Sequence, residues 1–198
     1  MTVLAGIFVV IRFAYKILAK VVLGMDDWFI AATMAAAAVT AIIAVYGTTP
    51  NGLGRDVWTL TPQQITRSFK FFHVIAWIYF LKNTLLKLSI LSFYMHLFPS
   101  RRTQHVLLGT FVFTTLWGVA FILASIFQCW PVDYFWTHWD GLHRGKCTNM
   151  NAIAWSNAST NIALDVWILV IPVPKLQSLQ LHWKKKIGVS FMFCLGIL

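Results

Sequence analysis

Long apolar runs alternate with short polar segments along the whole chain. A helix needs about 20 predominantly apolar residues to cross a membrane, and five runs are close to that length or longer. The predicted spans are residues 1–18, 28–47, 71–98, 106–128 and 151–171. A sixth run, 187–198, is too short for a bilayer of ~30 Å at 1.5 Å per residue, so we expect the natural chain to continue at its ends. The pattern predicts an all-α polytopic transmembrane bundle, with residues 1–198 as one domain.

The composition agrees with a chain solvated largely by lipid. Hydrophobic residues make up 59% and charged residues 11%, whereas about 25% of an average soluble domain is charged. Lys and Arg number 16 against 6 acids, all of them aspartates, for a net charge of +10. A basic chain can indicate nucleic-acid binding, but here most basic residues lie at the ends of apolar runs. Such positions favour membrane lipids as partners and exclude nucleic acid.

The basic residues also predict the orientation. If Arg12 and Lys16 near the end of the first span are included, nine of them belong to the side of the loops after the first, third and fifth spans, and five lie in the loops after the second and fourth. By the positive-inside rule the first group is cytoplasmic, so the N-terminus faces outside. We expect a multi-pass protein of the plasma membrane. Lys184, Lys185 and Lys186 follow a leucine-spaced stretch and are expected to contact anionic headgroups.

A long outward loop between the fourth and fifth spans begins and ends with a cysteine. In an oxidising compartment, a Cys129–Cys147 disulfide would close it and fix the outer ends of two helices. Two free thiols are one alternative. A metal site that adds His138 and His143 is another, but the loop has no C-x2–4-C pair of the kind seen in structural zinc sites, so no metal is predicted.

Five aromatic residues of this loop predict a membrane-interface belt, with a ligand-covering lid as the alternative. They are Trp130, Tyr134, Phe135, Trp136 and Trp139. The other outward segment, 48–68, is rich in glycine and proline and is predicted to be a compact loop.

Polar residues inside the spans are the candidate site, because such residues are costly in a membrane. Asn157, Asn161 and Asp165 are four residues apart and share one helical face. Lys87 and Asp165 each lie about 10 Å from the predicted inner boundary, which allows an ion pair. This pair either only neutralises two buried charges or belongs to a ligand, ion or switch site. Lys82, near mid-membrane, either faces a polar cavity or snorkels.

No catalytic constellation or cofactor motif is present. Asp26 and Asp27 are adjacent and are predicted to cap the helix that starts near Trp28. Ser89 and Ser92 lie near His96 in sequence, but serines in spans usually bond a carbonyl one turn back. We therefore expect a non-enzymatic protein.

Several segments together resemble one family, the fungal rhodopsin domain-containing integral membrane proteins, which include proteins of the satratoxin biosynthetic cluster. The matching segments are GMDDWFI at 24–30, NGLGRDVW at 51–58, KLSILSFYMHLFP at 87–99, QCWPVDYFW with KC at 146–147, and NIALDVWILVIPVPKLQSL at 161–179 followed by KKKIG. The motif residues are Asp26, Asp27, Trp28, Gly52, Gly54, Lys87, Ser89, Tyr94, Cys129, Pro131, Cys147, Asn161, Asp165, Pro172 and Pro174.

The resemblance implies a receptor-like seven-helix topology with the N-terminus outside. Asp56 and His96 depart from the family pattern, where histidine and arginine are common. The resemblance does not imply a light sensor, because retinal proteins hold retinal through a lysine on their last helix, which this sequence lacks. We expect a sensing or accessory membrane role with a small-molecule ligand near Lys87, Asn161 and Asp165. The alternatives are a small-molecule transporter and a membrane-embedded enzyme of secondary metabolism, whose acid would be Asp165.

Overall fold

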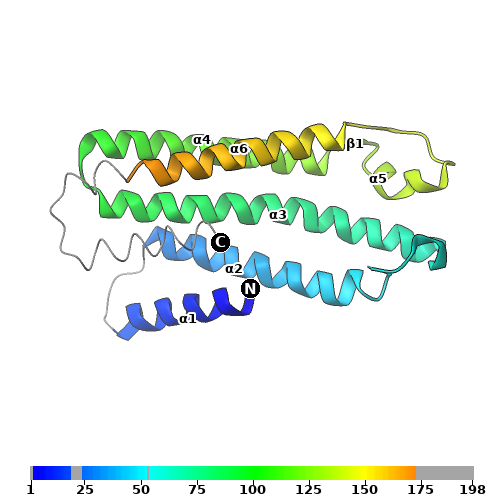
Figure 1. Cartoon of the computed structure of the whole chain (residues 1–198), viewed down its shortest axis with the longest axis horizontal. Helices are drawn as coiled ribbons and strands as arrows, with labels where there is room; N and C mark the ends of the chain where they lie inside the picture. The colour runs from blue at the N-terminus through cyan, green and yellow to red at the C-terminus, as the bar shows by residue number, and fades with distance from the viewer. Residues whose placement is uncertain (1, 19–23, 53, 173–198) are drawn as a thin grey trace. The chain divides into compact units, whose positions relative to one another are not determined.

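The computed structural model describes residues 2–18, 24–52 and 54–172 (Figure 1). The long helices are α1 (Thr2–Leu18), α2 (Met25–Ile42), α3 (Pro62–Leu97), α4 (Arg101–Ile126) and α6 (Met150–Val170). Shorter elements are the π-helix η1 (Ile43–Thr48), the 3-10 helices η2 (Val57–Thr59) and η3 (His138–Asp140), the helix α5 (Tyr134–Thr137), and the strands β1 (Cys129–Trp130) and β2 (Lys146–Cys147). The sixth apolar run, Pro174 and Lys184 to Lys186 lie outside the described residues.

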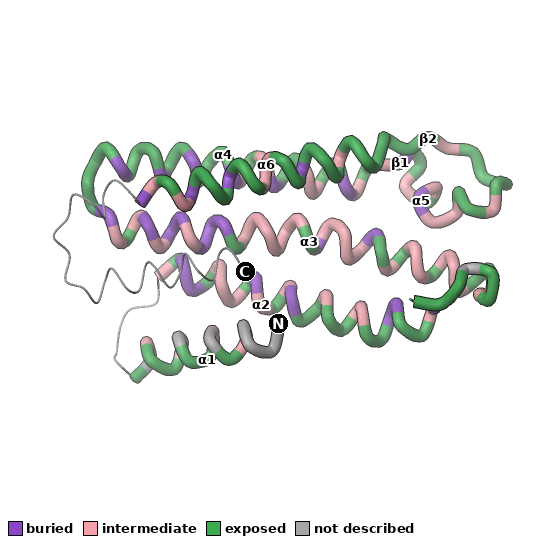
Figure 2. The backbone as a smooth tube through the Cα atoms, viewed as in Figure 1, coloured by how far each residue is buried: buried purple, intermediate pink, exposed green. Residues whose placement is uncertain are grey.

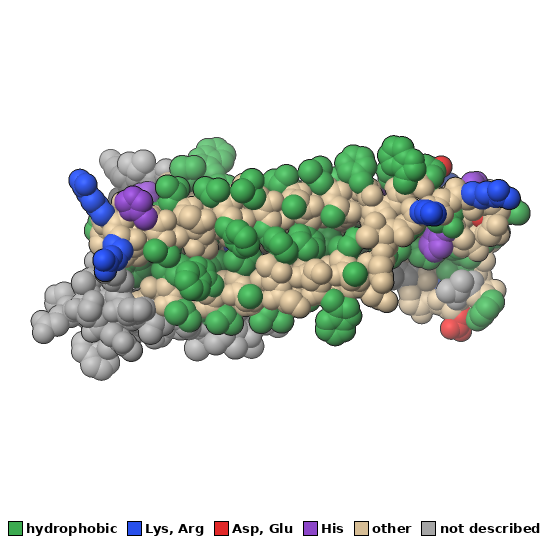
Figure 3. Space-filling model, turned by 90° about the horizontal axis from the view of Figure 1, so that it is seen from above, with side chains coloured by type: hydrophobic (Ala, Val, Ile, Leu, Met, Phe, Trp, Pro, Cys, Tyr) green, Lys and Arg blue, Asp and Glu red, His purple; other side chains and the backbone are tan. Residues whose placement is uncertain are grey.

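The predicted helical class is confirmed, and the described residues form a membrane protein with several apolar helices. Within the described residues, three helical segments are long and apolar enough to cross a bilayer: Met25–Thr48, Pro62–Leu97 and Arg101–Ile126. On the face seen in Figure 3, Lys and Arg side chains lie toward both ends with hydrophobic side chains between them. Charged ends and an apolar middle are expected of helices that cross lipid. Helices also form where the first and fifth spans were predicted, over Thr2–Leu18 and Met150–Val170.

Helix α3 begins nine residues before the predicted start at 71, which corrects the prediction that all of 48–68 is loop. The backbone N–H of Thr61 donates to the side-chain oxygen of Gln64 at 2.9 Å, and Pro62 occupies the first turn. A Thr-x-x-Gln capping box followed by proline is a strong helix start, and it outweighs the polar composition of this segment.

Helix α3 lies between α2 and α4 (Figure 1). Buried positions concentrate in its C-terminal half, between Lys87 and Tyr94 (Figure 2). Helix α4 approaches closely, since a β-carbon at Gly118 would overlap the side chain of Thr84. Small residues at such contacts are the usual means by which helices associate in lipid. The core formed by α2, α3 and α4 therefore lies along α3.

The chain divides into two compact units, Met1–Ile153 and Ala154–Leu198. The described part of the second unit is α6 from Ala154 onward and its end at Pro172.

Candidate functional site

A buried ionic cluster joins α1 to the start of α2. The ammonium of Lys16 lies 2.6 Å from Oδ2 of Asp27 and 3.6 Å from Oδ2 of Asp26. Both aspartates are almost fully enclosed, with 1% of Asp27 and 5% of Asp26 exposed. A carboxylate this far from water needs a cationic partner and hydrogen bonds, and Lys16 supplies the cation.

The cluster also caps α2 and reaches α3. The backbone N–H of Gly24 donates to Oδ2 of Asp27 at 3.0 Å, which confirms the predicted capping role for Asp27. Helix α2 begins at Met25, three residues before the predicted start at Trp28, so both aspartates lie within its first turn. The hydroxyl of Ser89 on α3 donates to the backbone oxygen of Asp26 at 3.1 Å. Three helices thus meet at the start of α2, and negative charge there is favoured by the helix dipole. The sequence had indicated Lys16 only as a topology signal.

Two lysines of α3 were predicted to lie inside the membrane. Lys87 is buried, with 4% of its surface exposed, and it lies within a candidate span. Lys82 is half-buried, and its ammonium lies 6.0 Å from the ring centroid of Tyr79, less than one turn earlier. The burial of Lys87 makes it the strongest intramembrane candidate on this helix.

Two of the predicted polar residues of α6 contact each other along the helix, as their spacing of four residues predicts. The side-chain amide of Asn161 donates to the side-chain oxygen of Asn157 at 2.9 Å, so the two share a face of the helix. Asp165 lies one turn beyond Asn161. The pairing of Asp165 with Lys87 stays a prediction.

The predicted disulfide is confirmed. Cys129 and Cys147 are bonded, and they pair across the two antiparallel strands β1 and β2. Their thiols are consumed, so the alternative of a cysteine–histidine metal site loses two of its four ligands. Within the described residues no group of three or more metal-ligating side chains comes together.

The disulfide closes a cap, residues 129–147, over the first half of α3. We call it the outer cap, after the side of the membrane that the sequence predicts for it. Phe135 is 3% exposed, and its ring centroid lies 4.8 Å from that of His73 and 6.5 Å from that of Phe69. This corrects the membrane-belt prediction for Phe135, because the short helix α5 turns its ring onto α3 and away from lipid. Trp130, by contrast, is 77% exposed, as a belt residue would be.

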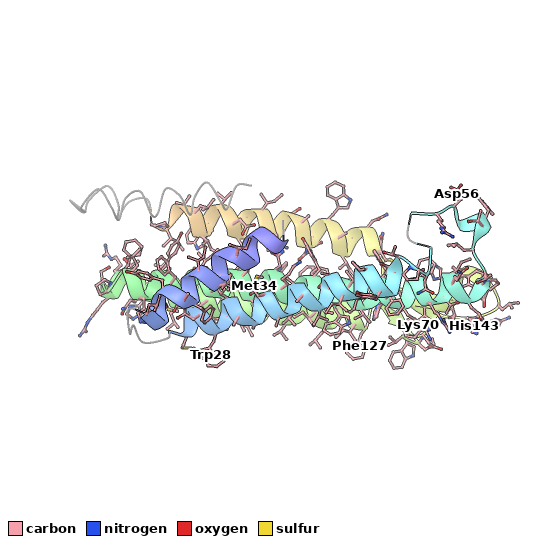
Figure 4. The ribbon with its side chains drawn as sticks, turned by 90° about the horizontal axis from the view of Figure 1, so that it is seen from below. Trp28, Met34, Asp56, Lys70, Phe127 and His143 are labelled. Atoms are coloured by element: carbon pink, nitrogen blue, oxygen red, sulfur yellow. A yellow bond between two sulfur atoms is a disulfide. The ribbon has the colours of Figure 1, made fainter. Side chains whose placement is uncertain are left out.

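Polar contacts also hold the outer cap against α3. The indole N–H of Trp139 donates to the hydroxyl of Thr66 at 3.1 Å. The ammonium of Lys70 lies 5.3 Å from the ring centroid of Trp136, within cation–π range. In Figure 4, Lys70 and His143 lie toward one end of the bundle and Trp28 lies toward the other. The outer cap and the Lys16 cluster therefore occupy opposite ends of the helices.

The carboxyl group of Asp140, in the cap, has a lowered pKa. The backbone N–H of Leu142 donates to its carboxylate at 2.9 Å and lowers the pKa. The ring of His143, whose Nδ1 lies 3.0 Å away, lowers it further.

The ion pair of Lys16 and the burial of His73 were not predicted from the sequence. The partnership of Lys16 depends on α1 lying beside α2, which no local pattern shows. His73 is 6% exposed and lies near the start of the third predicted span. An ionisable residue inside an apolar run is the signal that could have identified it.

Comparison with known proteins places these features in a family. The model of the fungal rhodopsin domain matches residues 11–198. The SAT4 family membrane protein of Emericella nidulans is 29% identical over 152 residues, which cover 74% of this chain and 38% of the relative. Satratoxin biosynthesis SC1 cluster protein 4 of Stachybotrys chartarum is 30% identical over 122 residues, 60% of this chain and 44% of the relative. Receptor GIN3 of Arthrobotrys oligospora is 25% identical over 170 residues, 86% of this chain and 41% of the relative.

These alignments cover less than half of the length of each of these relatives. No solved structure matches the chain.

Proposed function

Because this chain belongs to the fungal rhodopsin domain family, we propose that it is part of a receptor-like seven-helix protein that senses a small molecule from within the membrane. The printed name of one relative, Receptor GIN3, supports a receptor role. The three candidate spans are compatible with a larger helical bundle of this type. We further propose the plasma membrane as its location.

The burial of Lys87 is the observation that carries this proposal. A lysine that is 4% exposed within a span is expensive to maintain in lipid, and such residues usually mark substrate, ion or ligand sites. We propose that Lys87, with Asn161 and Asp165, contributes polar contacts to the ligand. Lys82 and Asn157 would extend the polar lining.

The outer cap supports the proposed orientation. Disulfides persist in oxidising compartments, so the Cys129–Cys147 bond favours an extracytoplasmic cap. Arg101 and Arg102 begin α4 at its other end, where the positive-inside rule favours the cytoplasm.

The name of the satratoxin cluster relative favours a second candidate, an accessory membrane role in secondary metabolism. Such a protein would transport a metabolite or act on it, with Asp165 as the acid. Uptake of a metabolite into proteoliposomes that contain the protein distinguishes transport from sensing. Turnover that is lost in a folded Asp165→Asn variant would favour an enzyme.

The thermal stability of the purified full-length protein tests the sensing proposal. Wild type, Lys87→Met, Asp165→Asn and the double mutant are screened against fungal metabolites, with Lys70→Met as a control lysine near the outer end of the same helix. A metabolite that raises the Tm of wild type and Lys70→Met, but not of Lys87→Met, supports the site. If both single variants collapse and the double mutant recovers, the pair is structural and Lys87 is not a ligand residue.

A further inference from the structure

The buried face of α4 consists mostly of small and polar residues. These residues are Thr103, Leu107, Thr110, Thr114, Gly118 and Ser125. This face packs on α3, because a β-carbon at Gly118 would overlap Thr84 and the rings of Phe121 and Phe80 lie 6.0 Å apart. Small residues alone explain close packing of helices in lipid. They do not explain the hydroxyl groups that lie on this face.

The two contacts define the register between the antiparallel helices. Gly118 faces Thr84, and a step of four residues returns each helix to nearly the same face. One turn further, Thr114 lies level with Leu88. We call the strip formed by Thr84, Leu88, Thr114, Trp117 and Gly118 the α3–α4 seam.

Hydroxyl groups in this protein usually bond their own helix. Thr33, Thr40, Thr84 and Thr115 each donate to the carbonyl four residues earlier, at 2.7 to 2.9 Å. This back-bonding is the normal solution for threonine in a helix that lacks access to water.

Two polar atoms of the seam have no such solution. The hydroxyl of Thr114 and the indole N–H of Trp117 are buried and lack a hydrogen-bond partner among the described residues. Thr114 is 2% exposed. The ring of Trp117 packs on Phe121 at 4.5 Å, and Phe121 in turn contacts Phe80 of α3, so the indole lies along the same seam.

Buried polar groups are nearly always paired, and lipid offers no water to pair them. We propose that the α3–α4 seam binds a hydrogen-bonding oxygen, which accepts from the indole N–H of Trp117 and exchanges a hydrogen bond with the hydroxyl of Thr114, three residues earlier on the same helix. The oxygen belongs to an ordered water or to the hydroxyl or carbonyl group of a small molecule. This site is independent of the sensing role proposed for Lys87.

Removing the hydroxyl of Thr114 tests the site through the sign of the stability change. Thr114→Val in the full-length protein is compared with Thr33→Val, a buried threonine whose hydroxyl bonds the carbonyl of Phe29. If the seam is occupied, Thr114→Val lowers the Tm by several degrees more than Thr33→Val does. A Tm of Thr114→Val that equals or exceeds the Tm of Thr33→Val overturns the proposal, because deleting an unpaired buried hydroxyl is neutral or stabilising.

The indole signal of Trp117 provides a second readout in the folded wild-type protein. Its Nε1–H resonance is identified by its loss in Trp117→Phe, and we expect the shift of a hydrogen-bonded indole. A cross-peak to water identifies water as the partner, and a signal that moves after exhaustive detergent exchange identifies an extracted small molecule. An indole with the shift of a free N–H overturns the proposal.

Discussion

The ammonium of Lys16 lies 2.6 Å from the carboxylate of Asp27, eleven residues further along the chain. The same carboxylate oxygen accepts the backbone N–H of Gly24 at 3.0 Å. One buried side chain therefore caps the second helix and holds the first helix against it. Both roles depend on the charge of Asp27.

We predict that Asp27→Asn destabilises the full-length protein by about 1–3 kcal/mol, because Lys16 would lose its nearest charged partner. This is less than the usual cost of breaking a fully buried pair, since the side chain of Lys16 is 19% exposed. Thermal unfolding monitored by circular dichroism measures the effect. Asp26→Asn is the matched comparison, and its longer 3.6 Å contact predicts a smaller loss. Equal effects of the two variants would contradict the assigned roles.

The disulfide should protect both cap cysteines from thiol reagents under non-reducing conditions. A Cys129→Ala/Cys147→Ala double variant should lose about 3 kcal/mol of stability, because the bond closes a loop with a sequence separation of 18. Mass spectrometry after alkylation, with and without reductant, measures the first effect and thermal unfolding the second. Rapid labelling of either cysteine without reductant is the contrary result.

Asp140 should titrate below its ordinary pKa of 3.8, chiefly because the Leu142 N–H stabilises its charged form. A lowered folded-state pKa contributes stability above the unfolded-state value. That contribution is lost as the pH falls from about 3.8 through the folded-state pKa. Carboxyl NMR of the cap measures the titration, and His143→Gln should raise the pKa partway. An Asp140 that titrates at or above 3.8 contradicts the cap geometry.

Gly118→Ala should destabilise the α3–α4 packing by about 1–3 kcal/mol, because the added methyl group meets the Thr84 side chain. Gly109→Ala in the same helix is the control, since a β-carbon there meets nothing within 4 Å. Thermal unfolding compares the two. Thr84→Ala should partly rescue Gly118→Ala, and a simple sum of the two effects would contradict direct contact.

Local patterns predicted much of this architecture. The length of the apolar runs located the long helices, since a helix that crosses lipid needs about 20 apolar residues. Cysteines at the two ends of one loop predicted the disulfide, and aspartates at a helix start predicted the cap of α2. The capping box of Thr61 and Gln64, with Pro62 in the first turn, also indicates the early start of α3 in the local sequence. The prediction placed this start too late because the surrounding polar residues favour a loop.

The sequence by itself determined which segments become helices, because backbone hydrogen bonding in lipid allows few other choices. Only the tertiary structure decided which side chains meet across those helices. Lys16 pairs with Asp27, Phe135 packs against His73, and Gly118 approaches the side chain of Thr84. These relationships depend on the rotation and register of one helix against another. Both are set by close packing between residues far apart in the chain.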